Sequence, residues 1–262
     1  MEAAIEEHLK ITAAPSKPNA NDYIKQIFSD FVEMHGDRLF GDDASITTGI
    51  ALLDETPVTV IGQNRGKNLE EQIKFNYSMG QPEGYRKALR AVRQAEKFGR
   101  PIVFFVDTTG AYPGREAENR GQSNAIATNL MELAYVKVPT ISVVIGFGGS
   151  GGALALSVAD RIVMLEFSTF GVISPKSCAN ILWKDTSREF EAASYLKITP
   201  KELKKVGFAD VIIEEEGGSL EEIASQVKQE IKSFLLESKN LSTRELQDKR
   251  MRRYCECEHF DY

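Results

Sequence analysis

A unit made of a buried strand, a glycine-rich turn and a helix occurs twice in succession in the middle of this chain. The strand, turn and helix are expected over 102–106, 107–114 and 116–135 in the first unit, and over 138–145, 146–152 and 153–159 in the second. Strands that alternate with helices in this way form parallel βαβ units. Ligands of such sheets bind where the turns leave the carboxyl ends of the strands. The sequence therefore predicts an α/β fold in which both glycine turns border one crevice.

The flanking sequence continues the α/β pattern. Apolar residues spaced three and four apart predict a helix that starts at Asn21 and runs through Val32, with Asn21 or Asp22 as its cap. The other expected elements are a hairpin of strands 46–53 and 58–63, an extended loop over 66–84, strands 161–166, 170–173 and 211–214, and helices 82–97, 176–183, 189–195, 199–206 and 219–236.

The length and composition indicate a single domain. A chain of 262 residues that is 42% hydrophobic fills one substantial core, and two full domains of this size would be cramped. We expect an N-terminal arm over 1–20, because apolar periodicity is weak there, and a domain over 21–238. Residues 239–262 are dense in charge and are expected to form a surface helix or a partner-facing tail.

The charge and the terminus exclude several classes of protein. A net charge of −6 argues against a chain that coats nucleic acid, because phosphate binding needs a concentrated basic face. The first residues are acidic where a secretory signal is basic, and no apolar stretch is long enough to span a bilayer. We expect a cytoplasmic protein whose function requires neither a membrane nor nucleic acid.

The cysteines do not form a disulfide framework. Cys178 lies in the body of the chain, whereas Cys255 and Cys257 lie close together near its end. With His259, these two thiols supply three of the four ligands of a zinc site. The absence of a fourth ligand favours a solvated tail over a metal centre, so no metal is expected in this chain.

The second glycine turn has two possible roles. Its glycines are Gly146, Gly148, Gly149, Gly151 and Gly152. The first N–H groups of a helix have no intrahelical acceptor, and the helix dipole adds positive potential, so an anion or a developing oxyanion is stabilised there. Alternatively, the glycines allow the helix to pack closely on the sheet. The residues alone leave both roles open.

The same turn also matches the nucleophile elbow of serine hydrolases, with Ser150 as the nucleophile. In that fold the catalytic histidine follows the serine in the chain. The sequence has three histidines, and of these His259 alone follows Ser150. A scarcity of histidine disfavours the hydrolase and favours catalysis by backbone dipoles together with a cofactor.

Two further groups of residues carry an open interpretation. Asp107 and Tyr112 either contribute hydrogen bonds to a site or fix the first glycine turn and its capping. The basic side chains of the helix over 82–97 either bind an anion or form a solvated face, which is the more usual role of such a run; they are Arg86, Lys87, Arg90 and Arg93.

Several motifs resemble those of the carboxyltransferase alpha subunit of bacterial acetyl-CoA carboxylase. They occur in order from about residue 20 to residue 250. The segments that carry the resemblance are 82–88 (PEGYRKA), 107–114 (DTTGAYPG), 120–123 (RGQS), 148–153 (GGSGGA), 172–175 (VISP), 181–184 (ILWK) and 241–243 (LST).

The resemblance implies a crotonase-like fold and a carboxyl transfer from carboxybiotin to acetyl-CoA that gives malonyl-CoA for fatty acid synthesis. It implies that biotin is attached to a separate biotin carboxyl carrier protein, that biotin carboxylase belongs to the full complex, and that a carboxyltransferase beta subunit with bound zinc completes the site. Gly151 and Gly152 would then be the catalytic residues that hold an oxyanion on biotin. We expect substrate binding by other residues of the two turns, Gly148, Gly149, Gly110, Ala111, Tyr112 and Gly114.

Three positions depart from the family pattern. The family usually has proline where Thr109 stands, glutamate where Phe147 stands, and glutamate where Lys176 stands. A cation at the start of a helix is unfavourable by roughly 0.3 to 1 kcal/mol, which applies to Lys176. These departures leave open a divergent or noncatalytic paralogue that acts as a binding subunit.

Overall fold

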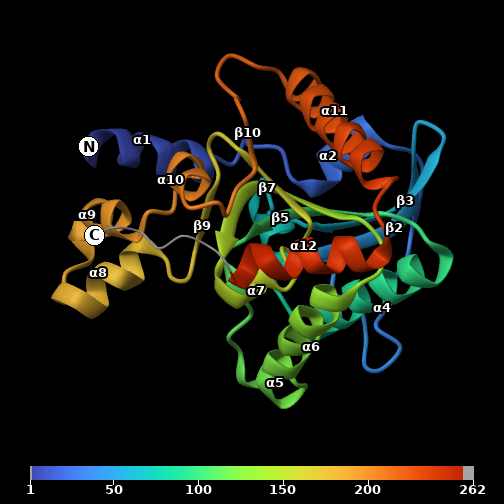
Figure 1. Ribbon diagram of the computed structural model, residues 1–262. Helices are drawn as coiled ribbons and strands as arrows, with labels where there is room; N and C mark the ends of the chain where they lie inside the picture. The colour runs from blue at the N-terminus through green and yellow to red at the C-terminus, as the bar shows by residue number, and fades with distance from the viewer. Residues whose placement is uncertain (1, 256–262) are drawn as a thin grey trace.

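The computed structural model describes residues 2–255 and contains a central twisted sheet (Figure 1). The described part of this sheet has eight strands in the order β1-β2-β3-β5-β7-β8-β10, with β9 paired to β7. The strands are β1 (Ser29–Glu33), β2 (Ile46–Leu53), β3 (Thr56–Gln63), β5 (Ile102–Thr108), β7 (Thr140–Gly149), β8 (Arg161–Leu165), β9 (Thr169–Gly171) and β10 (Val211–Ile213). The pairs from β3 to β10 are parallel, as the repeated strand-turn-helix unit predicts, and β1, β2 and β3 are antiparallel neighbours.

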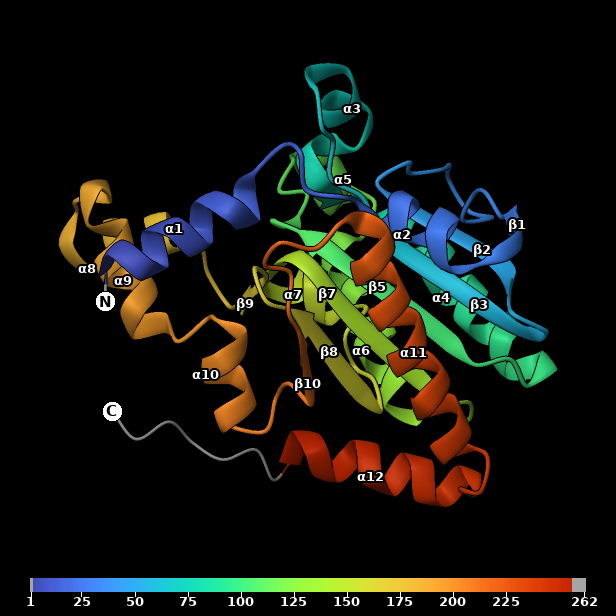
Figure 2. The same ribbon diagram turned by 90° about the horizontal axis from the view of Figure 1, so that it is seen from above.

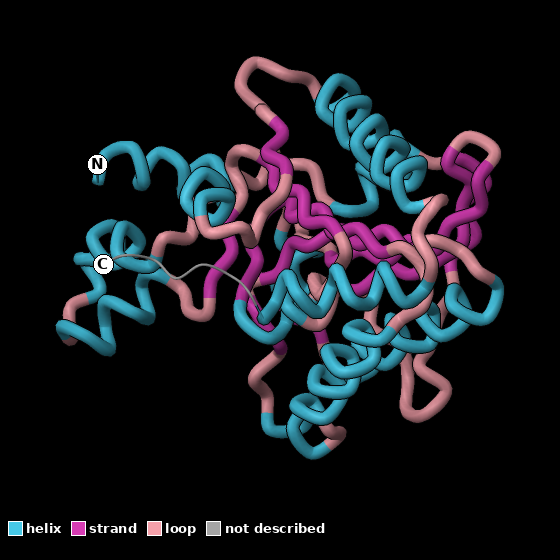
Figure 3. Tube along the Cα trace, viewed as in Figure 1, coloured by secondary structure: helices cyan, strands magenta, loops and turns pink. Residues whose placement is uncertain are grey.

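Helices cover both faces of the sheet (Figures 1 and 3). One face carries α4 (Pro82–Phe98), α6 (Gln122–Tyr135) and α12 (Thr243–Cys255), and the other carries α2 (Ala20–Ile27) and α11 (Leu220–Ser238). Successive residues of β5 point to opposite faces, so that Phe104 packs against α4 and α6 while Phe105 packs against α2 and α11. This alternation gives each helical layer its own apolar core.

A helical extension projects from the sheet beside β9 (Figure 2). It consists of α1 (Glu2–Ala13), α8 (Pro175–Trp183), η2 (Thr186–Arg188), α9 (Glu189–Leu196) and α10 (Pro200–Lys205). Ile5 of α1 is buried against Ala193 and Ile198, and this small cluster is separate from the two cores of the sheet.

The N-terminal region differs from its prediction. The arm over 1–20 contains a regular helix, α1, because Ile5 finds its apolar partners in a segment almost 190 residues away. The helix expected from Asn21 begins at Ala20, since Asn19 forms a capping box with Asp22, and it ends at Ile27. Val32 belongs to β1, where it pairs with β2.

Three segments in the middle of the chain also differ from their predictions. The loop expected over 66–84 contains α3 (Leu69–Lys74), η1 (Asn76–Ser78) and β4 (Met79–Gly80). The helix expected over 116–135 is divided into α5 (Arg115–Asn119) and α6 at Gly121, whose φ of 85° is left-handed. The helix expected over 153–159 is α7 (Ser150–Leu154), which starts earlier because β7 extends to Gly149.

The helix α12 is tied to the sheet by a buried arginine. Arg250 is 1% exposed, and its guanidinium donates to Asp160 at 2.8 Å and to the carbonyl oxygens of Leu133 and Val136 at the end of α6. Residues 243–255 of the expected tail therefore form a helix, which was one of the two alternatives, and a buried side chain anchors this helix to the sheet. Among residues 2–255, no helix has the length and apolar character needed to cross a membrane.

Candidate functional site

The second glycine turn joins the carboxyl end of β7 to the start of α7. Gly149 is the N-cap residue of α7 and has no side chain that could accept from the first turn of the helix. Ser150 follows with a φ of 55°, a left-handed conformation that is strained for a residue with a Cβ atom. The turn therefore presents backbone N–H groups that no side chain caps, at the positive end of a helix.

Close packing explains three of the glycines in this turn. A Cβ atom on Gly148 would lie 2.3 Å from the ring of Phe170. On Gly149 it would lie 2.5 Å from the carbonyl of Thr109, and on Gly152 it would lie 2.7 Å from the amide nitrogen of Ala111. The second glycine turn thus packs directly on the first, and at these positions the packing interpretation is correct.

Gly151 is different, because a side chain would fit there. The nearest atom to an added Cβ is the Cγ2 of Ile126 at 3.6 Å, which is an ordinary contact, and its φ is not left-handed. Neither packing nor backbone conformation requires glycine at this position. An incoming ligand that needs close approach to the helix start is a remaining reason for the absence of a side chain.

The first glycine turn is built around Thr108. The hydroxyl of this buried residue lies within hydrogen-bonding distance of the carbonyl oxygens of Ser78 and Gly110, which share its single hydrogen, and it accepts the amide N–H of Gly110 at 3.1 Å. Gly110 and Ala111 form the short strand β6, which pairs with β4. The structure therefore brings Gly110 and Ala111 against Gly152, as the two-turn crevice predicts.

The other two predicted residues of the first turn lie farther along. Tyr112 donates its amide to Gly80 at 3.0 Å, and its ring covers Gly114 so closely that a Cβ atom there would lie 2.3 Å from it. These contacts hold the loop, which matches the alternative role that the sequence gave to Tyr112. Neither residue lines the pocket that Thr109, Phe147 and residues 148–150 border.

A pocket of about 250 Å³ lies beside the second turn. Its wall includes Thr109, Phe147 and residues 148–150, with Ser174 and Pro175 at the start of α8. Gly151 and Gly152 lie in the first turn of α7, directly after the wall residue Ser150. Lys176 is exposed next to the pocket, and two of the three departures from the family pattern, Thr109 and Phe147, line it directly.

A buried ion pair stands behind the pocket wall. Asp107 is 1% exposed at the end of β5, and Arg65 Nε donates to its Oδ2 at 3.1 Å. Burial raises the pKa of the Asp107 carboxyl, and the charge of Arg65 opposes that rise. Asp107 therefore does not face the pocket as a catalytic acid, and its contacts are with the backbone and with Arg65.

Two buried polar side chains beneath the turn were not identified from the sequence. Gln63, the last residue of β3, donates Nε2 to the carbonyl oxygen of Gly152 at 2.9 Å. The hydroxyl of Tyr85 lies against Gly152 and has no hydrogen-bond partner among the described residues, and burial raises its pKa. Gln63 occupies an ordinary strand position, and Tyr85, although it lies in the 82–88 motif, was expected only on the apolar face of a helix. The contact of each with Gly152 depends on the tertiary fold.

The contacts of Ser150 do not support a serine hydrolase. Within residues 2–255, no side chain forms a hydrogen bond with its exposed hydroxyl. His8 contacts the carbonyl of Ser168 at 2.8 Å, and His35 contacts Asp42 at 3.0 Å. His259 lies outside the described residues, as does Cys257, so the proposed cluster of Cys255, Cys257 and His259 is not tested; Cys255 itself is exposed.

The basic side chains of α4 are largely occupied by partners within the chain. Arg86 pairs with Asp37 and Glu83, Lys87 pairs with Asp42, and Arg93 pairs with Glu132. Arg90 donates to the carbonyls of His35 and Gly36. These contacts favour a structural role for the basic run. Among the described residues there is no group of three acidic, cysteine or histidine side chains arranged to hold a metal ion.

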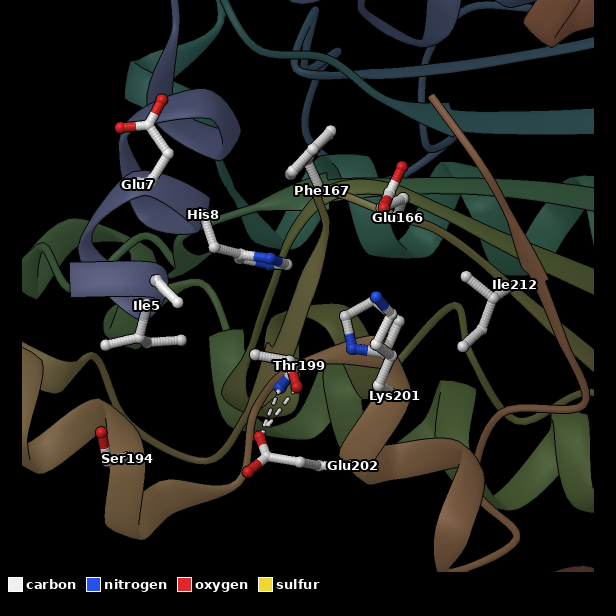
Figure 4. Close-up of a pocket in the computed structure, with 12 residues that line it drawn as sticks. Ile5, Glu7, His8, Glu166, Phe167, Ser194, Thr199, Lys201, Glu202 and Ile212 are labelled. Atoms are coloured by element: carbon white, nitrogen blue, oxygen red, sulfur yellow. Dashed lines mark hydrogen bonds between the residues drawn. The ribbon is translucent and has the colours of Figure 1, made fainter. Parts of the chain in front are cut away.

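A second pocket, of about 490 Å³, is separate from both glycine turns (Figure 4). It lies between α1, the turn after β8 and α10, and its lining includes His8, Phe167 and Lys201. Because the carbonyl of Ser168 can only accept, Nε2 of His8 carries the hydrogen of their contact. Burial also lowers the pKa of His8, so the ring is neutral near neutral pH and joins α1 to the loop before β9.

The comparisons with known proteins agree with this architecture. Residues 4–258 match the model of the family described as acetyl co-enzyme A carboxylase carboxyltransferase-like. The acetyl-coenzyme A carboxylase carboxyl transferase subunit alpha of Halalkalibacterium halodurans is 52% identical over 252 residues, which cover 95% of this chain and 78% of that protein. The subunit of the same name from Clostridium perfringens is 55% identical over 230 residues, which cover 88% of this chain and 85% of that protein.

Solved structures with low sequence identity share the fold. A transcarboxylase 12S chain has a TM-score of 0.70 at 20% identity and is matched over 85% of this chain and 42% of that one. A chain of a Pseudomonas malonate decarboxylase hetero-tetramer has a TM-score of 0.71 at 17% identity, over 90% of this chain and 94% of that one. The expected crotonase-like carboxyltransferase fold is confirmed. With its sequence relatives and its fold in agreement, the chain belongs to the acetyl co-enzyme A carboxylase carboxyltransferase-like family.

Proposed function

We propose that this chain is the alpha subunit of the carboxyltransferase of acetyl-CoA carboxylase. With a beta subunit it acts as a biotin-dependent transferase in the cytoplasm and supplies malonyl-CoA for fatty acid synthesis. The observation that carries this proposal is the uncapped start of α7 beside the pocket, with Gly151 open to a ligand. The named relatives, at 52% and 55% identity, support the same activity.

The backbone N–H groups of the second glycine turn would stabilise negative charge, and they would not transfer protons. When bound, biotin on the biotin carboxyl carrier protein would supply the carboxyl group, and the ureido nitrogen that this group leaves would take up the proton that the methyl carbon of acetyl-CoA loses. The amides of Gly151 and Gly152 would hold the ureido group by donating hydrogen bonds to its oxygen, which would stabilise negative charge there. A donor of this kind lowers the barrier by roughly 3 to 4 kcal/mol in other enzymes. The adjacent pocket has a largely apolar wall that includes Phe147, Ile173 and Ile198, which limits the access of water.

The other predicted site residues support this arrangement in two ways. Gly148 and Gly149 line the pocket and would contact a substrate through their backbone, whereas Gly110 and Ala111 brace Gly152 from below. Tyr112 and Gly114 form the loop that continues from them. The beta subunit would complete the site and hold the zinc, and biotin carboxylase would regenerate the carboxylated carrier. In this proposal residues 1–20 are an N-terminal arm, residues 21–238 are the carboxyltransferase domain, and residues 239–262 are a C-terminal tail.

Reconstitution with a beta subunit tests the proposal. The complex is expected to decarboxylate malonyl-CoA in a biotin-dependent manner, and Gly151→Val should lower the turnover by on the order of 10². Gly41→Val is the matched control, because Gly41 is also half-buried, has no left-handed φ, and has its nearest neighbouring atom 4.0 Å from an added Cβ. Full activity of the Gly151→Val complex would exclude this site.

A second candidate is a noncatalytic binding subunit, favoured by the position of Thr109 and Phe147 in the pocket wall. Such a chain would assemble with the beta subunit but would not support turnover. Restoring the family residues with Thr109→Pro, Phe147→Glu and Lys176→Glu should then recover activity. If the unaltered complex already turns over at a rate comparable to that of the triple variant, the noncatalytic interpretation is wrong.

A further inference from the structure

Asp107 connects the ends of two neighbouring strands behind the glycine turn. Its Oδ1 accepts the amide N–H of Phe147 at 2.9 Å, and its Oδ2 accepts Nε of Arg65 at 3.1 Å. Phe147 is the residue directly before Gly148 in β7, while Asp107 lies near the end of β5. A single carboxylate therefore fixes the backbone that leads into the turn.

Gly146 provides the space for this contact. A Cβ atom at position 146 would lie 2.4 Å from Oδ1 of Asp107 and 2.5 Å from its Cγ. The carboxylate thus lies directly against the backbone of β7, and no other residue type fits there without displacing it. Gly146 is the one glycine of the 146–152 segment whose role is explained by a charged side chain.

Arg65 contacts the side chain of Phe147, whose backbone amide is bound by Asp107. Its guanidinium carbon lies 5.5 Å from the centre of the Phe147 ring, a distance at which a cation is attracted to the ring face. The side chain of Arg65 is 14% exposed, and that of Asp107 is 1% exposed. Asp107 also interacts electrostatically with Lys17, in the segment before α2, and with Tyr23 of α2. The guanidinium therefore both compensates the buried carboxylate and packs on the pocket wall.

We propose that Arg65 and Asp107 are positioning residues that orient the backbone from Phe147 into the glycine turn for oxyanion binding. The inference rests on the proposed function for the reaction, but the hydrogen bonds that carry it belong to this chain alone. Loss of the carboxylate releases the Phe147 amide, so the donors at the start of α7 move relative to the substrate. A misplacement of about 1 Å costs on the order of 10²-fold in rate in other enzymes.

A comparison of two buried ion pairs tests the proposal. Asp107→Leu, in the complex with the beta subunit, should lower kcat by about 10² while the KM for the acyl-CoA changes less than about threefold. Asp160→Leu is the control, because Asp160 is also buried, pairs with Arg250 and binds a strand amide, but at the start of β7. It should lower the melting temperature to a similar extent and leave kcat within about threefold.

Substitutions of Arg65 test the same contact from its other side, with the Lys variant as the one that keeps a partner for the buried carboxylate. Arg65→Met keeps much of the apolar contact with Phe147 and removes the charge, so kcat should fall about tenfold. Arg65→Lys keeps a cation near Asp107 and should restore kcat to within about threefold of the unaltered complex. An unchanged kcat for Arg65→Met, or an equal loss for Lys and Met, would overturn the positioning role.

Hydrogen exchange separates this inference from the proposed function. Amide exchange of the segment 146–152 should be faster in Asp107→Leu than in the unaltered chain, and unchanged in Asp160→Leu. If the unaltered complex has no biotin-dependent activity but exchange responds in this way, the proposed function fails and the positioning of the turn stands. If activity is present and neither exchange nor kcat responds to Asp107→Leu, the positioning inference fails.

Discussion

Gln63 and Gly152, 89 residues apart, are joined by a buried hydrogen bond of 2.9 Å from the Nε2 of the glutamine to the carbonyl oxygen of the glycine. The bond replaces one that α7 cannot make for itself. The helix ends at Leu154, and the amide of Leu156 donates to Ala153 instead of to Gly152. The end of β3 thus supplies the missing donor to a helix of five residues.

Gln63→Leu should lower the free energy of unfolding by about 1 to 3 kcal/mol, because the carbonyl of Gly152 would be buried without a donor. Denaturant unfolding measures the change. Gln226→Leu on the exposed face of α11 is the control and should shift the free energy by less than about 0.5 kcal/mol. Equal effects of the two substitutions would show that the bond to Gly152 contributes nothing specific.

Alanine substitutions should separate the two adjacent glycines of α7. Gly152→Ala places a methyl group 2.7 Å from the amide nitrogen of Ala111 and should destabilise the fold by roughly 1 to 3 kcal/mol. Gly151→Ala meets no such obstacle, so the free energy of unfolding should stay within about 1 kcal/mol, while turnover falls on the order of tenfold. Thermal unfolding and steady-state kinetics check both. A destabilised Gly151→Ala variant would contradict the open space at this position.

Arg250→Met should destabilise the protein by about 3 to 5 kcal/mol, because it leaves the buried carboxylate of Asp160 without its partner. Arg244→Met lies on the same helix, where the Arg244 side chain is 91% exposed and pairs only loosely with Asp248, so it should change stability by less than about 1 kcal/mol. Equilibrium unfolding of both variants measures the difference. If they are equally stable, α12 is not anchored through Arg250.

Protonation of His8 is expected to lower the stability of the folded protein at acidic pH. Burial lowers the pKa of its imidazole in the folded protein below the ordinary value of 6.5, so the unfolded chain binds the proton first. Stability from the neutral ring is therefore present above the unfolded pKa and declines as the pH falls through it. His8→Gln should reduce the difference in melting temperature between pH 7.5 and pH 5.5 relative to the unaltered protein. An identical difference would remove His8 from the acid response.

The sequence was most informative where local patterns and tertiary contacts agree. The hairpin of β2 and β3 follows from two strand-forming segments separated by turn residues, although β3 begins at Thr56, inside the expected turn 54–57. The helix α4 follows from Pro82 in its first turn and from the apolar spacing after it. The two glycine turns were correctly expected to meet, because parallel strands place their carboxyl ends at one edge. These elements needed no partner distant in sequence to be recognised.

The missed features depend on such partners. Val32 fits the helical spacing of the preceding residues, but backbone pairing with Ile50 makes it part of a strand. The glutamine at the end of β3 acquires its role only when residue 152 lies over it. The family resemblance assigned the oxyanion to Gly151 and Gly152 together, whereas the geometry distinguishes a glycine that packing requires from one that it does not. That assignment stays a prediction until the variants are measured.

The contacts of α12 have a consequence for how the protein is made. The hydroxyl of Tyr254 accepts the amide of Ala159 and donates to the carbonyl of Ser157, and Arg250 binds Asp160, across 90 to 97 residues of chain. A growing chain on the ribosome cannot close the segment that follows α7 until residues 250–254 have emerged. Chains that stop before residue 250 therefore leave the polar groups of residues 157–160 without these partners.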